Sequence, residues 1–417
     1  MVGNKILVQD KRINEYVNQL GNLILSHSRK APFEFKFSVI RSSAINAFAT
    51  PGGYIYVNSG LFTLLENEGE LAGVMAHEIG HVNGRHIADM ISKAQKLSIG
   101  TVAATLAGIF LGGELAAAAG SFSAATATSL SLKYSREHEE EADKLGLSYL
   151  VASGYNGTTM LDFLKKMKRY EYYSGIVPPY FLTHPGTEER IIYLDALIQT
   201  RYHENGKTDI LGPFNRIQTL ILINEANPET NIKRFQGILM NDPNNVDALY
   251  GLALNQGKLG LIREPMENFQ KALLLAPEDS DILRDAGIFC YKIAKIEDAI
   301  LCLEKAHQLD NDNTDTVIFL GKAYMEKGAY NKALQLYQPL EKTKISDPEI
   351  YYNLAAAYGK TNNPGESHYY FGMYFKKINK FESALYHFKK ALEYFPADNQ
   401  KIKEINKQIS SLKGKSS

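Results

Sequence analysis

Two histidines four residues apart, with a glutamate beside the first, carry the clearest chemical signal: His77, Glu78 and His81 form the pattern HExxH. On a helix both imidazoles face the same way, so they can hold one zinc ion at Zn–N distances of about 2 Å. Glu78 can then reach a water beside the metal and act as general base. Residues 71–76, just before the motif, are apolar, and these three side chains would be costly to bury there unpaired. The motif therefore predicts one zinc ion per chain.

A third protein ligand is expected from an acidic stretch downstream, at residues 135–143. Glu139 and Asp143 in this stretch are four apart, so they share one face of a helix. Glu139 as third ligand would leave the fourth zinc position to water, which is the catalytic arrangement. Asp143 could accept a hydrogen bond from the outer nitrogen of a zinc-bound histidine. Spacing alone does not choose Glu139 over its neighbours. The competing carboxylates are Glu137, Glu140 and Glu141.

The elements that must position these residues are mostly helical. Hydrophobic periodicity predicts helices at about 10–27, 66–93, 134–152 and 188–201. Alternating residues predict a strand at 34–40, and two further short strands flank the Pro-Gly-Gly turn at 51–53. We therefore expect an α+β zincin-like metalloprotease domain over residues 1–205, mostly helical with a small sheet.

The C-terminal half of the sequence repeats itself every 34 residues. One register position holds the small residues Ala253, Gly287, Gly321 and Ala355, and another holds the large residues Phe235, Phe269, Leu303, Tyr337 and Phe371. A helix–turn–helix period of this length and composition is the tetratricopeptide signature. The sequence predicts a linker at 206–216, an all-α tetratricopeptide-repeat solenoid at 217–400, and a capping helix and tail at 401–417.

Composition excludes few functions, but it limits the kinds of partner that the protein is expected to bind. Lys plus Arg equals Asp plus Glu at 46 each, so there is no electrostatic reason to expect nucleic acid. The two cysteines, Cys290 and Cys302, are too few to bind a metal alone. We interpret them as buried free thiols in helices, with one disulfide between them as the alternative.

The stretch 97–132 carries one charged residue, Glu114, and is interrupted by two glycines at 112–113. A membrane-spanning helix needs about 20 consecutive apolar residues, so we expect a buried or membrane-touching helical hairpin, with peripheral membrane contact. No secretory signal is visible at the N-terminus. Two locations are therefore open, the cytosol or an exported chain whose signal has been removed.

Taken together, the motifs resemble the zinc endopeptidases that include the CAAX prenyl proteases, the HtpX proteases and the BepA-like proteases. The matching segments are 46–57, 77–81, 135–143, and His184-Pro185 with Arg190, in the same order. The resemblance covers about residues 7–196. It implies that Glu139 is the third ligand. It also implies that His184 and Arg190 act near the scissile bond as oxyanion stabilisers, or that His184 occludes the zinc. From the residues alone, His184 and Arg190 would be a His-Pro turn and a structural basic residue.

The attached repeats resemble the BepA-like branch, whose members work in the bacterial envelope on outer-membrane protein quality control. This implies an endopeptidase for unfolded or misassembled proteins, in the periplasm or at the envelope, whose repeats bind substrate or the outer-membrane assembly machinery. A polypeptide substrate would add as a strand along Asn46, Ala47, Phe48 and Ala49, because backbone pairing tolerates any sequence. The alternative is a non-catalytic or auto-inhibited chaperone or scaffold that acts through the repeats.

Overall fold

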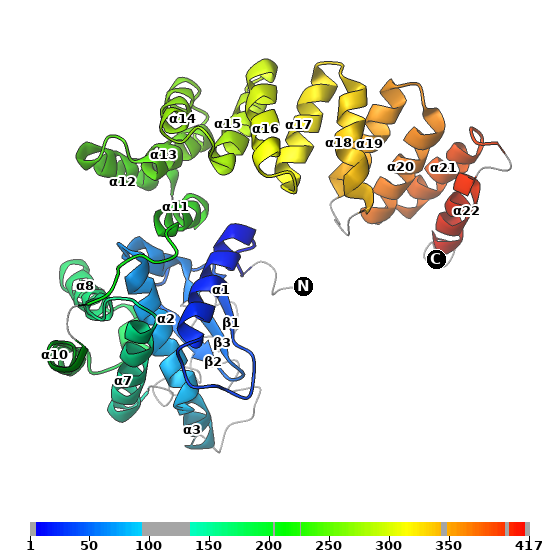
Figure 1. Cartoon of the computed structure of the whole chain (residues 1–417). Helices are drawn as coiled ribbons and strands as arrows, with labels where there is room; N and C mark the ends of the chain where they lie inside the picture. The colour runs from blue at the N-terminus through cyan, green and yellow to red at the C-terminus, as the bar shows by residue number, and fades with distance from the viewer. Residues whose placement is uncertain are drawn as a thin grey trace. The chain divides into compact units, whose positions relative to one another are not determined.

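The computed structural model describes residues 6–93, 134–202, 205–225, 227–342, 348–396 and 400–412. The chain divides into two compact units, Met1–Arg234 and Phe235–Ser417 (Figure 1). The hairpin expected at 97–132 lies outside the described residues. Among the helices that the structure does describe, none is long and apolar enough to cross a membrane.

A small three-stranded sheet lies in the first unit. Its strands are β1 (Lys36–Ile40), β2 (Ala47–Thr50) and β3 (Tyr54–Asn58), in the order β1-β3-β2. β1 pairs parallel with β3, and β2 pairs antiparallel with β3. Gly52 and Gly53 close the turn between β2 and β3 with φ values of 90° and 82°, which only glycine adopts readily. The order leaves β2 at one edge of the sheet, as a substrate-pairing strand requires.

Helices make up most of the first unit (Figure 1). They are α1 (Lys11–Leu25), α2 (Glu68–Asn83), α3 (His86–Lys93), α7 (Arg136–Ala152), α8 (Thr158–Ser174), α9 (Pro179–Thr183), α10 (Thr187–Leu197) and α11 (Phe214–Glu225). The predicted α+β class is confirmed. The single helix predicted at 66–93 is wrong, because Arg85 takes a left-handed φ of 58° and separates α2 from α3.

Two glycines allow α2 and α7 to cross closely. A Cβ at Gly80 would lie 2.5 Å from the backbone oxygen of Ala142, and one at Gly146 would lie 2.9 Å from the backbone nitrogen of His77. Real Cβ atoms do not approach other atoms so closely, so both positions need glycine. The HExxH face of α2 is thereby pressed directly against the acidic face of α7.

The segment predicted as a linker at 206–216 is bound to the first unit. The backbone of Gly69 donates to Thr208 at 2.7 Å, and that of Asn156 donates to Lys207 at 2.9 Å. The backbone amides of Ile210 and Leu211 also donate to the Glu68 carboxylate. The compact first unit therefore continues past residue 205, and these backbone bonds join residues 207–211 to it. The predicted bounds of the functional domains remain predictions.

The second unit contains only helices among its described residues, arranged as successive antiparallel pairs (Figure 1). After α12 (Pro228–Asn241), which straddles the two units, come α13 (Val246–Lys258), α14 (Arg263–Leu275), α15 (Ser280–Lys292), α16 (Ile296–Leu309), α17 (Thr314–Glu326), α18 (Tyr330–Lys342), α19 (Pro348–Lys360), α20 (Pro364–Lys377), α21 (Phe381–Leu392) and α22 (Gln400–Leu412). Predicted small and large positions meet here, since a Cβ at Gly287 would lie 2.6 Å from Leu303. Cys290 and Cys302 are free thiols, the first buried and the second half-buried.

Candidate metal centre

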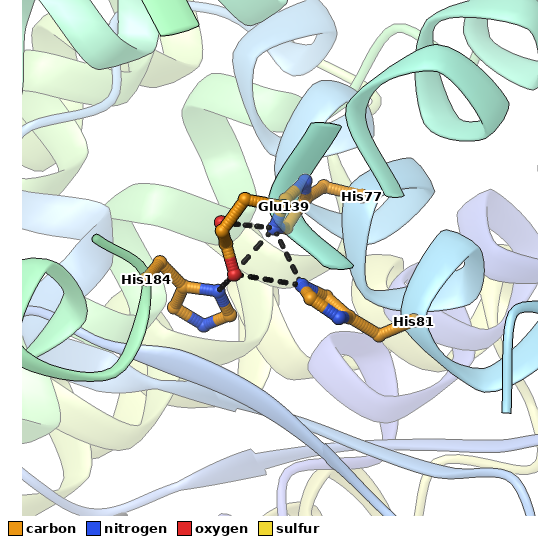
Figure 2. Close-up of side chains that lie close together, drawn as sticks. All are labelled: His77, His81, Glu139 and His184. Carbon is orange, nitrogen blue, oxygen red and sulfur yellow. Dashed lines mark hydrogen bonds and ion pairs between the residues drawn. The ribbon is translucent and has the colours of Figure 1, made fainter. Parts of the chain in front are cut away.

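Four side chains converge at the crossing of α2 and α7. His77 and His81 come from α2, Glu139 from α7, and His184 from the residue after α9. One nitrogen or oxygen atom of each lies within 4.8 Å of the others, and Figure 2 shows all four pointing toward one another. Nε2 of His81 lies 2.9 Å from Nε2 of His77 and 3.3 Å from Oε1 of Glu139, which is 3.1 Å from Nδ1 of His184.

Local structure explains why Glu139 is the acidic residue that joins this cluster. Ser135 caps α7, because its hydroxyl accepts from the backbone N–H of His138. The helix therefore starts at Arg136, which turns Glu139 and Asp143 inward while Glu140 stays exposed.

A buried arginine holds the two inward carboxylates. Arg190 donates to Asp143 at 2.7 and 2.8 Å and lies 2.7 Å from Glu139. Nδ1 of His77 lies 2.8 Å from Asp143 on the other side, and the Tyr193 hydroxyl also donates to Asp143. The Arg190 guanidinium and the His77 ring oppose the effect of burial and keep the pKa of Asp143 well below its ordinary value. The Asp143 carboxylate thus lies between the His77 ring and the Arg190 guanidinium.

Glu78 lies beside the cluster and is fully buried. Its side chain is 0% exposed, and neither carboxylate oxygen is bonded to any residue that the structure describes. Nε2 of His184, which has no hydrogen-bond partner among the described residues, is 3.6 Å from Oε1 of Glu78. Burial raises the pKa of Glu78. A buried carboxylate without partners is costly, so this one requires a water or a cation nearby.

The charges of the cluster fit a divalent cation. Three buried carboxylates, Glu78, Glu139 and Asp143, face one buried guanidinium, Arg190, so neutral histidines leave two negative charges unbalanced. Burial lowers the pKa of His77, but the Asp143 carboxylate outweighs it and raises that pKa to about 9. Without a metal, His77 therefore holds its proton more tightly than a free imidazole does. Imidazole and carboxylate donors in this number suit a transition-metal ion, and the residues present fit one.

Comparison with known proteins agrees with this geometry. Residues 9–198 match the model of peptidase family M48, and residues 321–362 match a TPR repeat. The chain carries an M48 peptidase domain. That domain contains α2, α7, α9 and the whole ligand cluster, and tetratricopeptide repeats follow it.

Several relatives of the M48 domain have names that state a function. The beta-barrel assembly-enhancing protease of Escherichia coli (strain K12) is 34% identical over 194 residues, which cover 45% of this chain and 39% of that protein. Its counterpart in Yersinia pestis is 28% identical over 370 residues, which cover 84% of this chain and 73% of that protein. The chain thus spans about two fifths of the first relative and about three quarters of the second.

Two further similarities are more distant. The mitochondrial metalloendopeptidase OMA1 of Schizosaccharomyces pombe is 29% identical over 189 residues, which cover 45% of this chain and 54% of that protein. The solved structure of YrrB, described as a TPR protein with an unusual peptide-binding site, covers 47% of this chain and 97% of its own, with 17% identity and a TM-score of 0.38.

The predicted substrate strand lies beside α2, the helix that carries the HExxH motif. β2 packs against α2, and the side chains of Asn46, Ala47, Phe48 and Ala49 are all buried. The buried side-chain amide of Asn46 has no hydrogen-bond partner in the described parts of the chain. Because these side chains point into the protein, only backbone groups of this strand are available to an added peptide.

Sequence reasoning missed the aromatic and second-layer residues of this M48 centre. The Tyr134 ring stacks on His81 with centroids 3.8 Å apart, and Tyr180 stacks on His184 at 4.4 Å. His86 lies directly behind His81. No spacing rule signals the tyrosines, which lie far along the chain from α2. A third histidine five residues after HExxH was a visible signal for His86.

Proposed function

We propose that the protein is a zinc-dependent endopeptidase that hydrolyses peptide bonds of unfolded or misassembled proteins. The observation that carries this proposal is the buried Glu78 carboxylate, unpartnered within the described structure, beside His77, His81 and Glu139. This is the arrangement of a hydrolytic zinc site, with three protein ligands and a general base next to them. The M48 domain and the protease names of its relatives support the same reaction.

Each residue near the cluster has a separate role in this proposal. His77, His81 and Glu139 would hold zinc, which when bound polarises the scissile carbonyl and lowers the pKa of water. Glu78 takes the proton of the attacking water and delivers it to the leaving amine. Asp143 keeps His77 in its binding orientation.

Two residues were candidates for stabilising the oxyanion, and the contacts favour one of them. Arg190 is 2% exposed and bonded to both Asp143 and Glu139, so its charge is already engaged. Nε2 of His184 has no partner among the described residues and lies 3.6 Å from Glu78. A protonated Nε2 at this position could donate to a developing oxyanion.

The substrate would reach this centre along the edge of β2. A cavity of about 630 Å³ begins where β2 ends, is lined by Thr50 and Gly52, and reaches His81. Its remaining wall includes the basic side chains Arg29, Lys30 and Arg85. A peptide paired with the backbone of β2 would continue into this cavity, which supports strand addition as the mode of binding.

The same geometry supports the second candidate function, an auto-inhibited chaperone or scaffold. His184 is 0% exposed and lies 3.1 Å from Glu139, where it could act as a fourth ligand and close the site. In that resting state the tetratricopeptide repeats would bind client or partner proteins. The relatives' name, beta-barrel assembly-enhancing protease, supports the outer-membrane assembly machinery as partner and the periplasm or envelope as location.

Degradation of casein by the purified full chain tests both functions. Wild type is compared with Glu78→Gln, and the zinc content of each is measured. Cleavage by wild type alone, with zinc bound in both, supports the hydrolytic role of Glu78. Zinc in both without cleavage in either would favour the auto-inhibited function.

A third variant, His184→Ala, separates the two roles of His184. Faster casein cleavage would mean that His184 occludes the site. Slower cleavage at full zinc content would mean that it assists the reaction. An unchanged rate would exclude both roles.

A further inference from the structure

Helix α3, which directly follows the HExxH helix, makes contacts that the proposed reaction does not use. We propose that His86 and Glu141 are positioning residues that orient the metal ligand His81, as part of a clasp between α3 and α7. The clasp consists of His86 and Asp89 on α3, and His138 and Glu141 on α7. The inference rests on the proposed metal site, but it concerns side chains outside the ligand set.

The first half of the clasp is a relay that begins at His81. Nε2 of His81 faces the ligand cluster, and its Nδ1 lies 3.0 Å from Nδ1 of His86. Nε2 of His86 lies 3.3 Å from Oε2 of Glu141. The other histidine ligand, His77, meets the Asp143 carboxylate directly at 2.8 Å. Both ligands therefore reach a carboxylate, one directly and the other through an intervening imidazole.

The relay has one consistent set of proton positions when a metal is bound at Nε2 of His81. Nδ1 of His81 then carries the proton and donates to Nδ1 of His86. His86 in turn carries its proton on Nε2 and donates to Glu141. A metal-binding histidine is held in its tautomer and ring orientation by such an outer hydrogen bond. Glu141 thereby fixes the tautomer of His86, and His86 fixes that of His81.

The backbone between α2 and α3 is shaped to place the His86 ring there. Arg85 takes a φ of 58°, which reverses the chain so that His86 folds back onto the end of α2. Any Cβ at Gly84 would overlap the His86 ring, so only glycine leaves room for it. His86 is itself 2% exposed. The backbone of Gly84 and Arg85 thus holds the His86 ring in one position.

The second half of the clasp joins the same two helices, but here the histidine is on α7 and the carboxylate is on α3. Nε2 of His138 lies 3.0 Å from Oδ2 of Asp89, and the His138 ring stacks on His86 with centroids 4.5 Å apart. α3 thus supplies one histidine and one carboxylate, and α7 supplies the reverse. Since α7 also carries Glu139, the clasp ties the helix of the third ligand to the residue behind His81.

Global stability does not account for this arrangement. The carboxylate side chains of Glu141 and Asp89 are 55% and 40% exposed. Ion pairs at such exposed positions contribute little to stability. Loss of an outer hydrogen-bond partner of a metal ligand, in contrast, typically lowers metal affinity about 10–100-fold. The clasp should therefore affect metal binding more than folding.

Zinc affinity of the full chain, measured by competition with a chromophoric chelator, tests the proposal. Glu141→Gln is expected to weaken zinc binding about 10-fold and His86→Phe by up to about 100-fold. The visible spectrum of the cobalt(II)-loaded protein should change in both, because the geometry at His81 changes. His86→Gln keeps an acceptor for His81 and should recover part of the affinity. Circular dichroism checks that each variant is folded.

Glu140→Gln is the matched control, because Glu140 is adjacent on α7, pairs with Lys144, and lies outside the clasp. An equal loss of zinc affinity in this control would mean that any lost negative charge on α7 weakens zinc binding, which would overturn the proposal. Wild-type affinity and spectrum in Glu141→Gln would overturn it as well, and this surface change should fold even if His86→Phe does not. Casein cleavage is measured separately, so a zinc-binding wild type that fails to cleave contradicts the proposed function without affecting this result.

Discussion

Replacing Glu68 should loosen the first turn of α2 and release the segment predicted as a linker. The Glu68 carboxylate is 0% exposed. It accepts hydrogen bonds from the hydroxyls of Tyr16 (2.9 Å) and Tyr155 (2.5 Å), and from the backbone amides of Ile210 (2.7 Å), Leu211 (2.8 Å) and Gly212 (3.2 Å). One side chain thus connects α1, α2, the residues after α7 and the segment before α11.

These contacts allow the loss of stability to be estimated for two variants. Glu68→Ala leaves three backbone amides and two tyrosine hydroxyls without this acceptor, at about 1–3 kcal/mol each when water cannot replace it. Because Ile210 is 37% exposed, water reaches this segment, and the low end for all five donors gives about 5 kcal/mol in total. Glu68→Gln keeps one oxygen for the three donors at Oε1, and Tyr16 can rotate to accept. Only the Gly212 amide then loses its partner, at about 1 kcal/mol.

Hydrogen exchange followed by mass spectrometry measures these losses of stability in the full chain, separately for peptides of each unit. Peptides from α2 and from residues 206–212 should lose protection in the order wild type, Glu68→Gln, Glu68→Ala. Peptides from the repeats serve as an internal reference. Glu66→Gln is the control, since the Glu66 side chain is 75% exposed and such changes usually stay within about 0.5 kcal/mol. A loss below about 1 kcal/mol in Glu68→Ala, or an equal loss in Glu68→Gln, would refute this reasoning.

Three further predictions concern packing, metal and thiols. Gly146→Ala should destabilise the M48 domain by about 1–3 kcal/mol and lower its zinc content, because the added Cβ would lie 2.9 Å from the backbone nitrogen of His77. Calorimetry and metal analysis check this, and full zinc content would contradict it. A chelator should lower the melting temperature of wild type, since an ion at 100 times its dissociation constant contributes about 2.7 kcal/mol. The melting temperature of His77→Ala, which lacks one of the metal-binding side chains, should not change with the chelator. Burial raises the pKa of the Cys290 thiol to about 12. A disulfide reagent should therefore modify Cys290 slowly at pH 8 in the native protein and rapidly in urea. Equal rates in the two conditions would contradict the burial of Cys290.

Features that depend on neighbouring residues were predictable from the sequence. The spacing of His77 and His81 specifies one helical face, and the structure places both on α2. The 34-residue period predicted which small and large side chains meet, because each repeat is a local unit. The alternation around the turn at 51–53 likewise gave β2 and β3 with nearly the correct ends.

Features that depend on distant residues were not predictable. Polar, glycine-containing composition predicted a linker at 206–216, yet Glu68 binds Ile210 across 142 positions of sequence. The helix break at Arg85 was missed because the hydrophobic pattern continues through it, and only the packing of His86 requires the left-handed residue. Glu139 was chosen over its neighbours by family resemblance, since the choice depends on how α7 is capped and rotated.

Burial of the centre places a condition on any hydrolysis there. His77, Glu78, His81, Glu139 and His184 are all 0–1% exposed, so a polypeptide cannot meet Glu78 while every side chain stays in place. His77 and His81 belong to a helix of 16 residues and Glu139 to one of 17, and their crossing is fixed by two glycines. His184 follows α9, a helix of only five residues with prolines at 178, 179 and 185 around it. Displacing His184 therefore disrupts the fewest backbone hydrogen bonds, so opening at α9 is the step that an active endopeptidase would require.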